Sequence, residues 1–301
     1  MQVDDPRLFF NSLMRIEKLE NGKKDELVFR SFPPHMNSAL SDQPSRTYGG
    51  TSVCYAFLAA KMVHGEQPNS ISLFYLRPGS CELPIDIKVK ILSRDKMFVE
   101  VIQCGYTLSR AYVKKHVIYH WKIVDADRKL VEDVVQPPDF YADDDRNYFE
   151  ETTKTARKER NDVYASPFNV RFVDYGSVQG SKETSLFWVR VPPDQQEHFK
   201  TKDISPDGFV MYISDYFICQ PAAISLRNNG RYFRAIGSLN HHVDVIEHDF
   251  DPFQWFLIQS TLESMTNDRS IFRFVVYSET KRVIAAGRQE CYTPSRQVNK
   301  L

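Results

Sequence analysis

At residues 209–219 the chain has the sequence FVMYISDYFIC, its most apolar stretch, with one carboxylate, Asp215, near the middle. Residues 205–207 before it (Ser-Pro-Asp) supply an N-cap, a proline suited to a first helical turn and an acid suited to the positive end of a helix dipole. Pro221 then biases the residue before it away from helical geometry. Because the stretch is apolar on every side, we expect one buried helix over residues 209–219.

An ionised carboxylate within such a helix must be hydrogen-bonded or paired, or its pKa must shift. Asp215 has apolar residues one turn away in both directions, among them Met211 and Cys219. The alternative is that Asp215 lies at a frayed rim of the helix and contacts water. Composition alone leaves both interpretations open.

The overall composition indicates a chain with a substantial core and no excess charge. Its 301 residues suggest one large or two ordinary domains, 42% of them are hydrophobic, and 39 basic residues balance 39 acidic ones. This balance argues against nucleic acid as a partner, and no apolar run approaches the roughly 18 residues of a membrane span. Because the first residues lack the basic and apolar regions of a secretory signal, we expect an intracellular protein.

The cysteines do not form a recognisable framework. They are odd in number, widely spaced and without a C-x-x-C pair, at positions Cys54, Cys81, Cys104, Cys219 and Cys291. This pattern argues against structural disulfides and against a zinc site, and predicts reduced, mostly buried thiols.

The first half of the chain combines one helix with a series of strands. Gly49 and Gly50 begin an alanine-rich helix over residues 48–63, whose small side chains allow close packing against a sheet. Alternating apolar and polar residues predict strands at residues 27–30, 70–76, 85–92, 97–104 and 110–124.

The second half repeats this order of elements. Strands are expected at residues 168–174 and 185–191, and after the helix at residues 232–245, 256–263, 271–277 and 282–292. Between the halves, charged residues dominate and predict a linker or a surface helix. The acidic triplet at residues 143–145 fits a solvated run better than a cation site.

The repeated order predicts an α+β fold of two tandem units, each a curved antiparallel sheet wrapped around a long helix. We place the first domain at residues 1–130, a charged linker at 131–165 and the second domain at 166–301. Only the second helix carries a carboxylate in its body, which predicts one working site rather than two.

The last strand offers a partner for that carboxylate. One of its faces is free of charge and consists of Val283, Ala285, Gly287, Gln289 and Cys291. This face should turn toward the helix, so Gln289 would point inward and could donate to Asp215. Ser238 could add a hydroxyl, although the alternation leaves its direction open. A purely structural network of these three residues remains an alternative.

Several short motifs follow one another along nearly the whole chain: RTYGG at residues 46–50, FYLRPG at 74–79, ISD at 213–215, SLNH at 238–241, PFQW at 252–255 and QE at 289–290. In this order they resemble the type II acyl-CoA thioesterases, a family of two tandem hotdog domains. The resemblance implies an acyl-CoA substrate and hydrolysis of its thioester to a free fatty acid and CoA, with no cofactor.

The resemblance also implies a catalytic set of an Asp, a Ser or Thr and a Gln that position and activate a water. By motif these roles fall on Asp215, Ser238 and Gln289. The sequence departs from the family at Thr51, where a Gln is usual after the glycine pair, at Ser72, where a His is common, and at Asn240, which replaces an acid. These departures spare the catalytic set and concern the acyl-chain and CoA contacts.

The chemistry of a thioester fits so small a set. A thiol leaves easily because its pKa is only about 8.5, so no strong general acid is required. The step needs a base for the water and donors for the developing oxyanion. Asp215 is the expected base; the helix N-terminus at Gly49 and Gly50 could donate to the oxyanion, or these glycines could serve close packing alone.

Two other functions stay open on the same scaffold. One is a non-hydrolytic acyl-CoA binding or regulatory protein, favoured if Asp215 and Gln289 lie too far apart to share a water. The other is a hydratase or dehydratase, which needs an acid paired with a histidine, for which His241 is the candidate. We also leave open assembly into a homo-oligomer.

The densest histidine cluster does not predict a metal site. His241 and His242 are adjacent and would face opposite sides of a strand, with His248 further on, and H-E-x-x-H is absent from the sequence. We therefore expect no metal.

The chain ends in Asn299, Lys300 and Leu301, which resembles the C-terminal peroxisomal address Ser-Lys-Leu with Asn in its first place. Together with the acyl-CoA interpretation, this predicts a peroxisomal location reached through the import receptor; the alternative is the cytoplasm.

Overall fold

The computed structural model describes residues 14–19, 26–33, 35, 46–65, 67–115, 168–172, 184–197, 205–266, 268–280 and 282–297. The linker expected at residues 131–165, its acidic triplet, both domain boundaries and the C-terminal tripeptide lie outside these residues and stay predictions. Within the described part of the chain, no helix is both long and apolar enough to cross a membrane.

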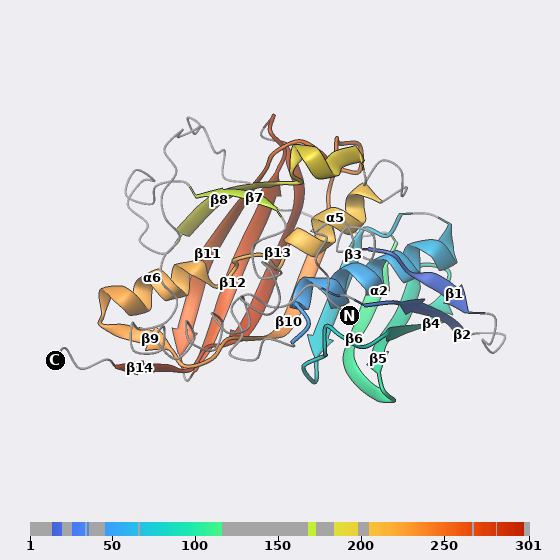
Figure 1. The fold of residues 1–301 in the computed structure, drawn as a ribbon, viewed down its shortest axis with the longest axis horizontal. Helices are drawn as coiled ribbons and strands as arrows, with labels where there is room; N and C mark the ends of the chain where they lie inside the picture. The colour runs from blue at the N-terminus through green and yellow to red at the C-terminus, as the bar shows by residue number, and fades with distance from the viewer. Residues whose placement is uncertain are drawn as a thin grey trace.

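One antiparallel sheet of twelve strands runs through the molecule (Figure 1). The first half contributes β1 (Glu17–Leu19), β2 (Glu26–Ser31), β3 (Ser70–Tyr75), β4 (Ile85–Ser93), β5 (Lys96–Gln103) and β6 (Tyr106–Lys114). The second half contributes β7 (Asn169–Phe172), β8 (Thr184–Arg190), β10 (Gly237–Val245), β11 (Phe256–Thr266), β12 (Arg269–Tyr277) and β13 (Val283–Tyr292). The short strands β9 (Arg231–Phe233) and β14 (Ser295–Gln297) form a separate pair.

The two halves join where β3 pairs with β10. The register runs from Asn240 opposite Phe74 to Asp244 opposite Ser70, and places Ile71 opposite Val243. Both of these apolar side chains are fully buried, so the seam is part of the core. The α+β architecture of two tandem helix-and-sheet units is confirmed, with the addition that their sheets are continuous.

Helix α2 (Gly49–His64) lies against the sheet of the first half, and α5 (Pro206–Ile213) packs beside it at the middle of the molecule (Figure 1). The second half also contains the 3-10 turn η1 (Pro193–Gln195) and α6 (Gln220–Asn228), which packs against β11. Residues 50–60 of α2 and 207–213 of α5 are all buried, as expected for helices enclosed on every side.

The prediction of one helix over residues 209–219 is wrong. Helix α5 ends at Ile213, residues 214–219 form a turn, and α6 begins at Gln220. Phe217 has a φ of 51°, in the left-handed region, which no right-handed helix can contain. Pro221 does not close the segment, because it sits in the first turn of α6, where its missing N–H has no helical partner to lose. Asp215 therefore belongs to a turn between two helices.

The start of α5 differs from the expected cap. Ser205 is the N-cap residue, but its side chain makes no capping bond; its Oγ accepts a hydrogen bond of 2.8 Å from Lys61 Nζ of α2. Asp207 lies in the first turn as predicted and is contacted by Lys61 Nζ at 3.4 Å and by His248 Nδ1 at 3.0 Å. The acid thus connects the helices of the two halves.

Several strand limits also differ from prediction. β6 begins at Tyr106, because Cys104 and Gly105 both have positive φ and form a two-residue hairpin turn. The strand expected at residues 232–245 is two strands, β9 and β10, and β1 and β14 were not predicted. Cys54, Cys219 and Cys291 are buried, while Cys81 is half-buried and Cys104 exposed, and no disulfide joins the five cysteines.

Candidate active site

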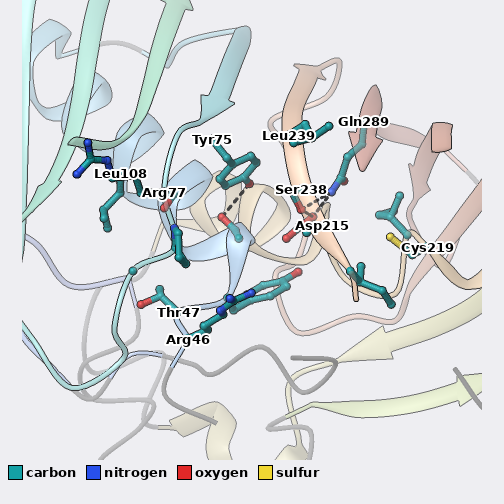
Figure 2. Close-up of a pocket in the computed structure, with 18 of the residues that line it drawn as sticks. Arg46, Thr47, Tyr75, Arg77, Leu108, Asp215, Cys219, Ser238, Leu239 and Gln289 are labelled. Carbon is teal, nitrogen blue, oxygen red and sulfur yellow. Dashed lines mark hydrogen bonds between the residues drawn. The ribbon is translucent and has the colours of Figure 1, made fainter. Parts of the chain in front are cut away.

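A cavity of about 280 Å³ lies where the two halves meet (Figure 2). Residues 46–49 and 75–79 form its wall on the first half, and residues 215–219, 236–239 and Gln289 form the wall on the second. Among the described residues that line it, Asp215 is the only carboxylate.

The structure brings Asp215, Ser238 and Gln289 together in this cavity (Figure 2). Gln289 Nε2 donates to Asp215 Oδ1 at 2.5 Å and to Ser238 Oγ at 2.8 Å. Ser238 Oγ donates to Asp215 Oδ1 at 3.3 Å. The amide and the hydroxyl therefore converge on one oxygen of the carboxylate.

The register of two neighbouring strands explains this convergence. On β13, Gln289 and Cys291 share the inner face, and Gln289 is only 1% exposed, as its alternation predicts. On β10, His241 lies opposite Gln289 and Ser238 lies opposite Cys291. Ser238 and His241 are three positions apart in the chain, whereas their partners Gln289 and Cys291 are two apart. A β-bulge between Ser238 and Asn240 absorbs the odd residue. The bulge settles the direction of Ser238, which the alternation alone had left open.

The N-terminus of α2 forms the other side of the carboxylate. The backbone N–H of Gly50 donates to Asp215. A Cβ on Gly49 would lie 2.5 Å from Asp215 Oδ2, and a Cβ on Gly50 would lie 2.3 Å from the Tyr212 carbonyl oxygen. Tyr75 adds a hydrogen bond of 3.0 Å from its hydroxyl to the Gly49 carbonyl. The glycine pair thus permits a close approach of the first half to Asp215.

The environment of Asp215 gives its carboxyl group a pKa that suits a general base. Burial raises its pKa to about 6, and the bonds from Gln289, Ser238 and the Gly50 backbone oppose that rise by stabilising the anion. The carboxylate is half-buried and reaches the cavity. It is therefore ionised at neutral pH and able to accept a proton.

The sequence profile of the acyl-CoA thioesterase C-terminal domain matches residues 137–293, more than half of the chain. The chain belongs to the acyl-CoA thioesterase family. This confirms the resemblance to the type II thioesterases and makes the protein a thioester hydrolase. No curated protein sequence matches this thioesterase significantly.

Solved structures share the fold of this thioesterase over almost its full length. The acyl-CoA thioesterase II TesB2 of Mycobacterium marinum is 16% identical, with a TM-score of 0.63 over 97% of this chain and 99% of the other. A tesB protein of Mycobacterium avium subsp. paratuberculosis gives the same identity and TM-score over 95% and 98%. The dehydratase domain of PpsC from Mycobacterium tuberculosis, in complex with C12:1-CoA, is 12% identical, with a TM-score of 0.59 over 94% and 99%. Because dehydratases share it, the fold alone does not define the reaction.

His241 is the residue of this thioesterase site that sequence reasoning did not place. Its ring is 1% exposed and lies behind Gln289, with Nδ1 2.7 Å from Gln289 Oε1 and Nε2 2.8 Å from Ser214 Oγ. Burial lowers its pKa to about 3, so the ring is neutral. The signal that could have revealed it is its cross-strand register with Gln289.

The neighbouring histidines of the thioesterase have other partners. His242 lies on the opposite face of β10, with Nδ1 2.8 Å from Ser72 Oγ and Nε2 3.0 Å from Asp244 Oδ1. His248 contacts Asp207, as described above. Within the described ranges, no three His, Cys, Asp or Glu side chains gather as a metal site would require.

Proposed function

We propose that this thioesterase hydrolyses fatty acyl-CoA to a free fatty acid and CoA by attack of a water that Asp215 deprotonates. The observation that carries the proposal is the convergence of Gln289 and Ser238 on Asp215 Oδ1, at the wall of a cavity shared by both halves. Two donors on one oxygen fix the plane of the carboxylate, so that its position relative to a substrate is set before binding.

The proposed step balances within the site. The water oxygen attacks the thioester carbonyl carbon while its proton passes to Asp215, and a tetrahedral intermediate forms. When the intermediate collapses, the C–S bond breaks and the thiolate of CoA takes the proton back from Asp215. A carboxyl group with a pKa of about 6 can both accept and return a proton near neutral pH. The thiolate leaves readily because a thiol pKa is only about 8.5.

Ser238 and Gln289 then have distinct parts. The amide of Gln289 donates to both other members, so its loss would free both the carboxylate and the hydroxyl to rotate. The Ser238 hydroxyl, which accepts from Gln289 and donates to Asp215, is also open to the cavity and can hold the water. Gly50 has its N–H committed to Asp215, so we assign this N–H to holding the base and not to the oxyanion.

The cavity lining suits both ends of an acyl-CoA. Arg46 and Arg77 line its first-half side, where Figure 2 shows them away from the carboxylate, and their charges match the phosphates of CoA. Leu108, Ile236 and Leu239 supply apolar surface for an acyl chain.

The two alternatives fit this geometry less well. A binding protein without hydrolysis would be favoured if Asp215 and Gln289 lay too far apart to share a water. Gln289 Nε2 lies only 2.5 Å from Asp215 Oδ1. A dehydratase needs a histidine facing the substrate together with an acid. His241 lies behind Gln289 and is not among the residues that line the cavity.

The test is release of free CoA from a panel of acyl-CoA chain lengths, measured for the wild type and for Asp215→Asn at saturating substrate. We expect turnover to fall by about 10²- to 10⁴-fold in the variant, the usual contribution of a general base, with an unchanged circular dichroism spectrum. Near-normal turnover of Asp215→Asn would remove this acid from the mechanism. Binding of acyl-CoA without any thiol release by the wild type would favour the binding protein.

A further inference from the structure

The ring of His241 is held on three sides within the core. Its Nδ1 lies 2.7 Å from Gln289 Oε1, and its Nε2 lies 2.8 Å from Ser214 Oγ. Phe274 stacks on its face, with ring centroids 5.1 Å apart and the planes within 7° of parallel. The plane of the imidazole and the direction of both nitrogens are therefore fixed.

The partner that His241 faces is an amide, and an amide has two ends of equal shape but opposite hydrogen-bonding character. Productive geometry needs the NH₂ end of Gln289 toward Asp215 and Ser238, where it donates to both. A flipped amide would point its oxygen at the carboxylate, and both groups would be acceptors. A donor that holds Oε1 on the opposite side makes the productive orientation the stable one.

His241 can be that donor in only one protonation pattern. A neutral ring carries one N–H, and Gln289 Oε1 can only accept, so the proton must lie on Nδ1. Nε2 is then an acceptor, and its contact with Ser214 Oγ is a hydrogen bond only when the hydroxyl proton points at the ring. Ser214 Oγ also lies 2.8 Å from the Met211 carbonyl oxygen, and its single proton can serve one of these two acceptors at a time.

We propose that His241 is a positioning residue, which locks the Gln289 amide with its NH₂ group toward Asp215 and Ser238. The hydrogen bonds then run in one direction, from Ser214 through His241 and Gln289 to Asp215. This inference rests on the proposed function, since it gives Gln289 its orientation for water activation. Because the ring does not line the cavity, it acts on turnover and leaves substrate binding alone.

Two substitutions test the effect of the Nδ1 donor apart from that of the rest of the ring. His241→Asn retains an NH₂ donor near the place of Nδ1, whereas His241→Gln places its amide near Nε2 and leaves Gln289 Oε1 without a donor. We expect kcat of His241→Gln to fall at least tenfold with KM within about twofold of the wild type. His241→Asn should recover most of that loss. Equal losses in both variants, or a rise in KM with unchanged kcat, would overturn the proposal.

A double-mutant cycle with Gln289→Ala distinguishes positioning from general packing. In the Gln289→Ala background, His241→Gln should cause no further loss of kcat, because there is no amide left to orient. A second, independent loss in that background would assign His241 a merely structural role. If Gln289→Ala itself retained normal turnover, Gln289 would have no part in the mechanism and this inference would fail, whereas failure of the proposed function itself is read from Asp215→Asn.

Ser214→Ala gives a further variant, should the histidine variants fold poorly. Ser214→Ala removes one of the two contacts that favour the ring proton on Nδ1, so kcat should fall severalfold without a change in KM. Unchanged kcat in this variant would overturn the directional chain. Solvent exchange of the Gln289 side-chain amide, followed by NMR, should accelerate in parallel with each loss of kcat; exchange as slow as in the wild type would contradict the proposal.

Discussion

The two halves contribute different helices to the contact between them. In the first half α2 is continuous over 16 residues and has no carboxylate. In the second half α5 ends after 8 residues, and a turn separates it from the 9 residues of α6. The interruption is what gives Asp215 its place, because a turn can present a carboxylate to a cavity that an enclosed helix could not reach.

The two halves contribute different groups to the same site. The first half supplies a helix N-terminus with its N–H groups and the space left by two glycines. The second half supplies the acid and, from β10 and β13, the two groups that hold it. Among the described residues that line the shared cavity, Asp215 is the only carboxylate, so both units contribute to one candidate site.

The largest effect on kcat in this comparison should come from filling the space between Gly49 of the first half and Asp215 of the second. In Gly49→Ala the new Cβ would lie 2.5 Å from Asp215 Oδ2, so the carboxylate or the helix must shift. A displacement of about 1 Å in a catalytic group costs on the order of 10²-fold, so we expect kcat to fall by about that factor or more.

The control for this variant is Met62→Ala on the same helix, where the side chain is 54% exposed. Gly49→Ala should keep the circular dichroism of the wild type, because alanine favours a helix over glycine. Met62→Ala should keep it as well, because that side chain is exposed. Full turnover in Gly49→Ala would show that the first half is only a scaffold.

The pH dependence should be smaller and follows from the pKa of Asp215, which burial raises to about 6. The base must be ionised to act, so kcat should be constant above that pH and fall about tenfold for each unit below it. The raised pKa of Asp215 also makes the free energy of unfolding depend on pH, in the opposite direction to the rate. The folded state binds this proton more tightly than the unfolded chain does, so the contribution of Asp215 to stability decreases as pH rises. The contribution of Asp215 to stability is thus highest below its ordinary pKa and is lost as pH rises through about 6.

Chromatographic measurement of released CoA from pH 4.5 to 8 would check the rate profile. A rate that is independent of pH across this range would exclude a carboxylate base with this pKa.

The smallest effect should come from the seam between the halves. Ile71→Val in β3 removes one buried methylene and should lower the free energy of unfolding by about 1 kcal/mol. Because β3 and β10 belong to one sheet, we expect the whole molecule to unfold in one transition. Ile258→Val in β11, remote from the seam in the strand order, is the matched control.

Denaturation in a Trp121→Phe background would test this expectation, since the remaining Trp188 and Trp255 both report on the second half. The fluorescence and circular dichroism midpoints of Ile71→Val should shift together. A fluorescence midpoint that does not move would mean that the halves unfold separately.

Much of the architecture follows from local pattern. The alternation of Ile87 and Val89 with Lys88 places β4 correctly, and the uncharged face of β13 directs Gln289 inward. These positions are predictable because a strand has a period of two, and burial of one face fixes which side each residue occupies.

What could not be predicted depends on non-local packing. Nothing in the apolar run around Phe217 predicts a residue with positive φ, since bulky side chains seldom adopt it. The bulge after Ser238 and the pairing of β3 with β10 are likewise set by contacts between segments far apart in the chain. The place of His241 depends on both, which is why sequence reasoning considered it as an acid–base partner of a dehydratase and as a possible metal ligand, but not as a partner of Gln289.

The continuous sheet has a consequence for how activity arises as the chain folds. Tyr48 donates to the carbonyl of Tyr212, 164 positions away, within the same interface that brings Gly49 to Asp215. Contacts of such sequence separation form late, because a long loop must close before they can stabilise anything. The glycine pair comes from the first unit and the acid from the second, so the first unit by itself lacks the acid. We therefore expect hydrolysis only from a chain in which both units are folded and packed together.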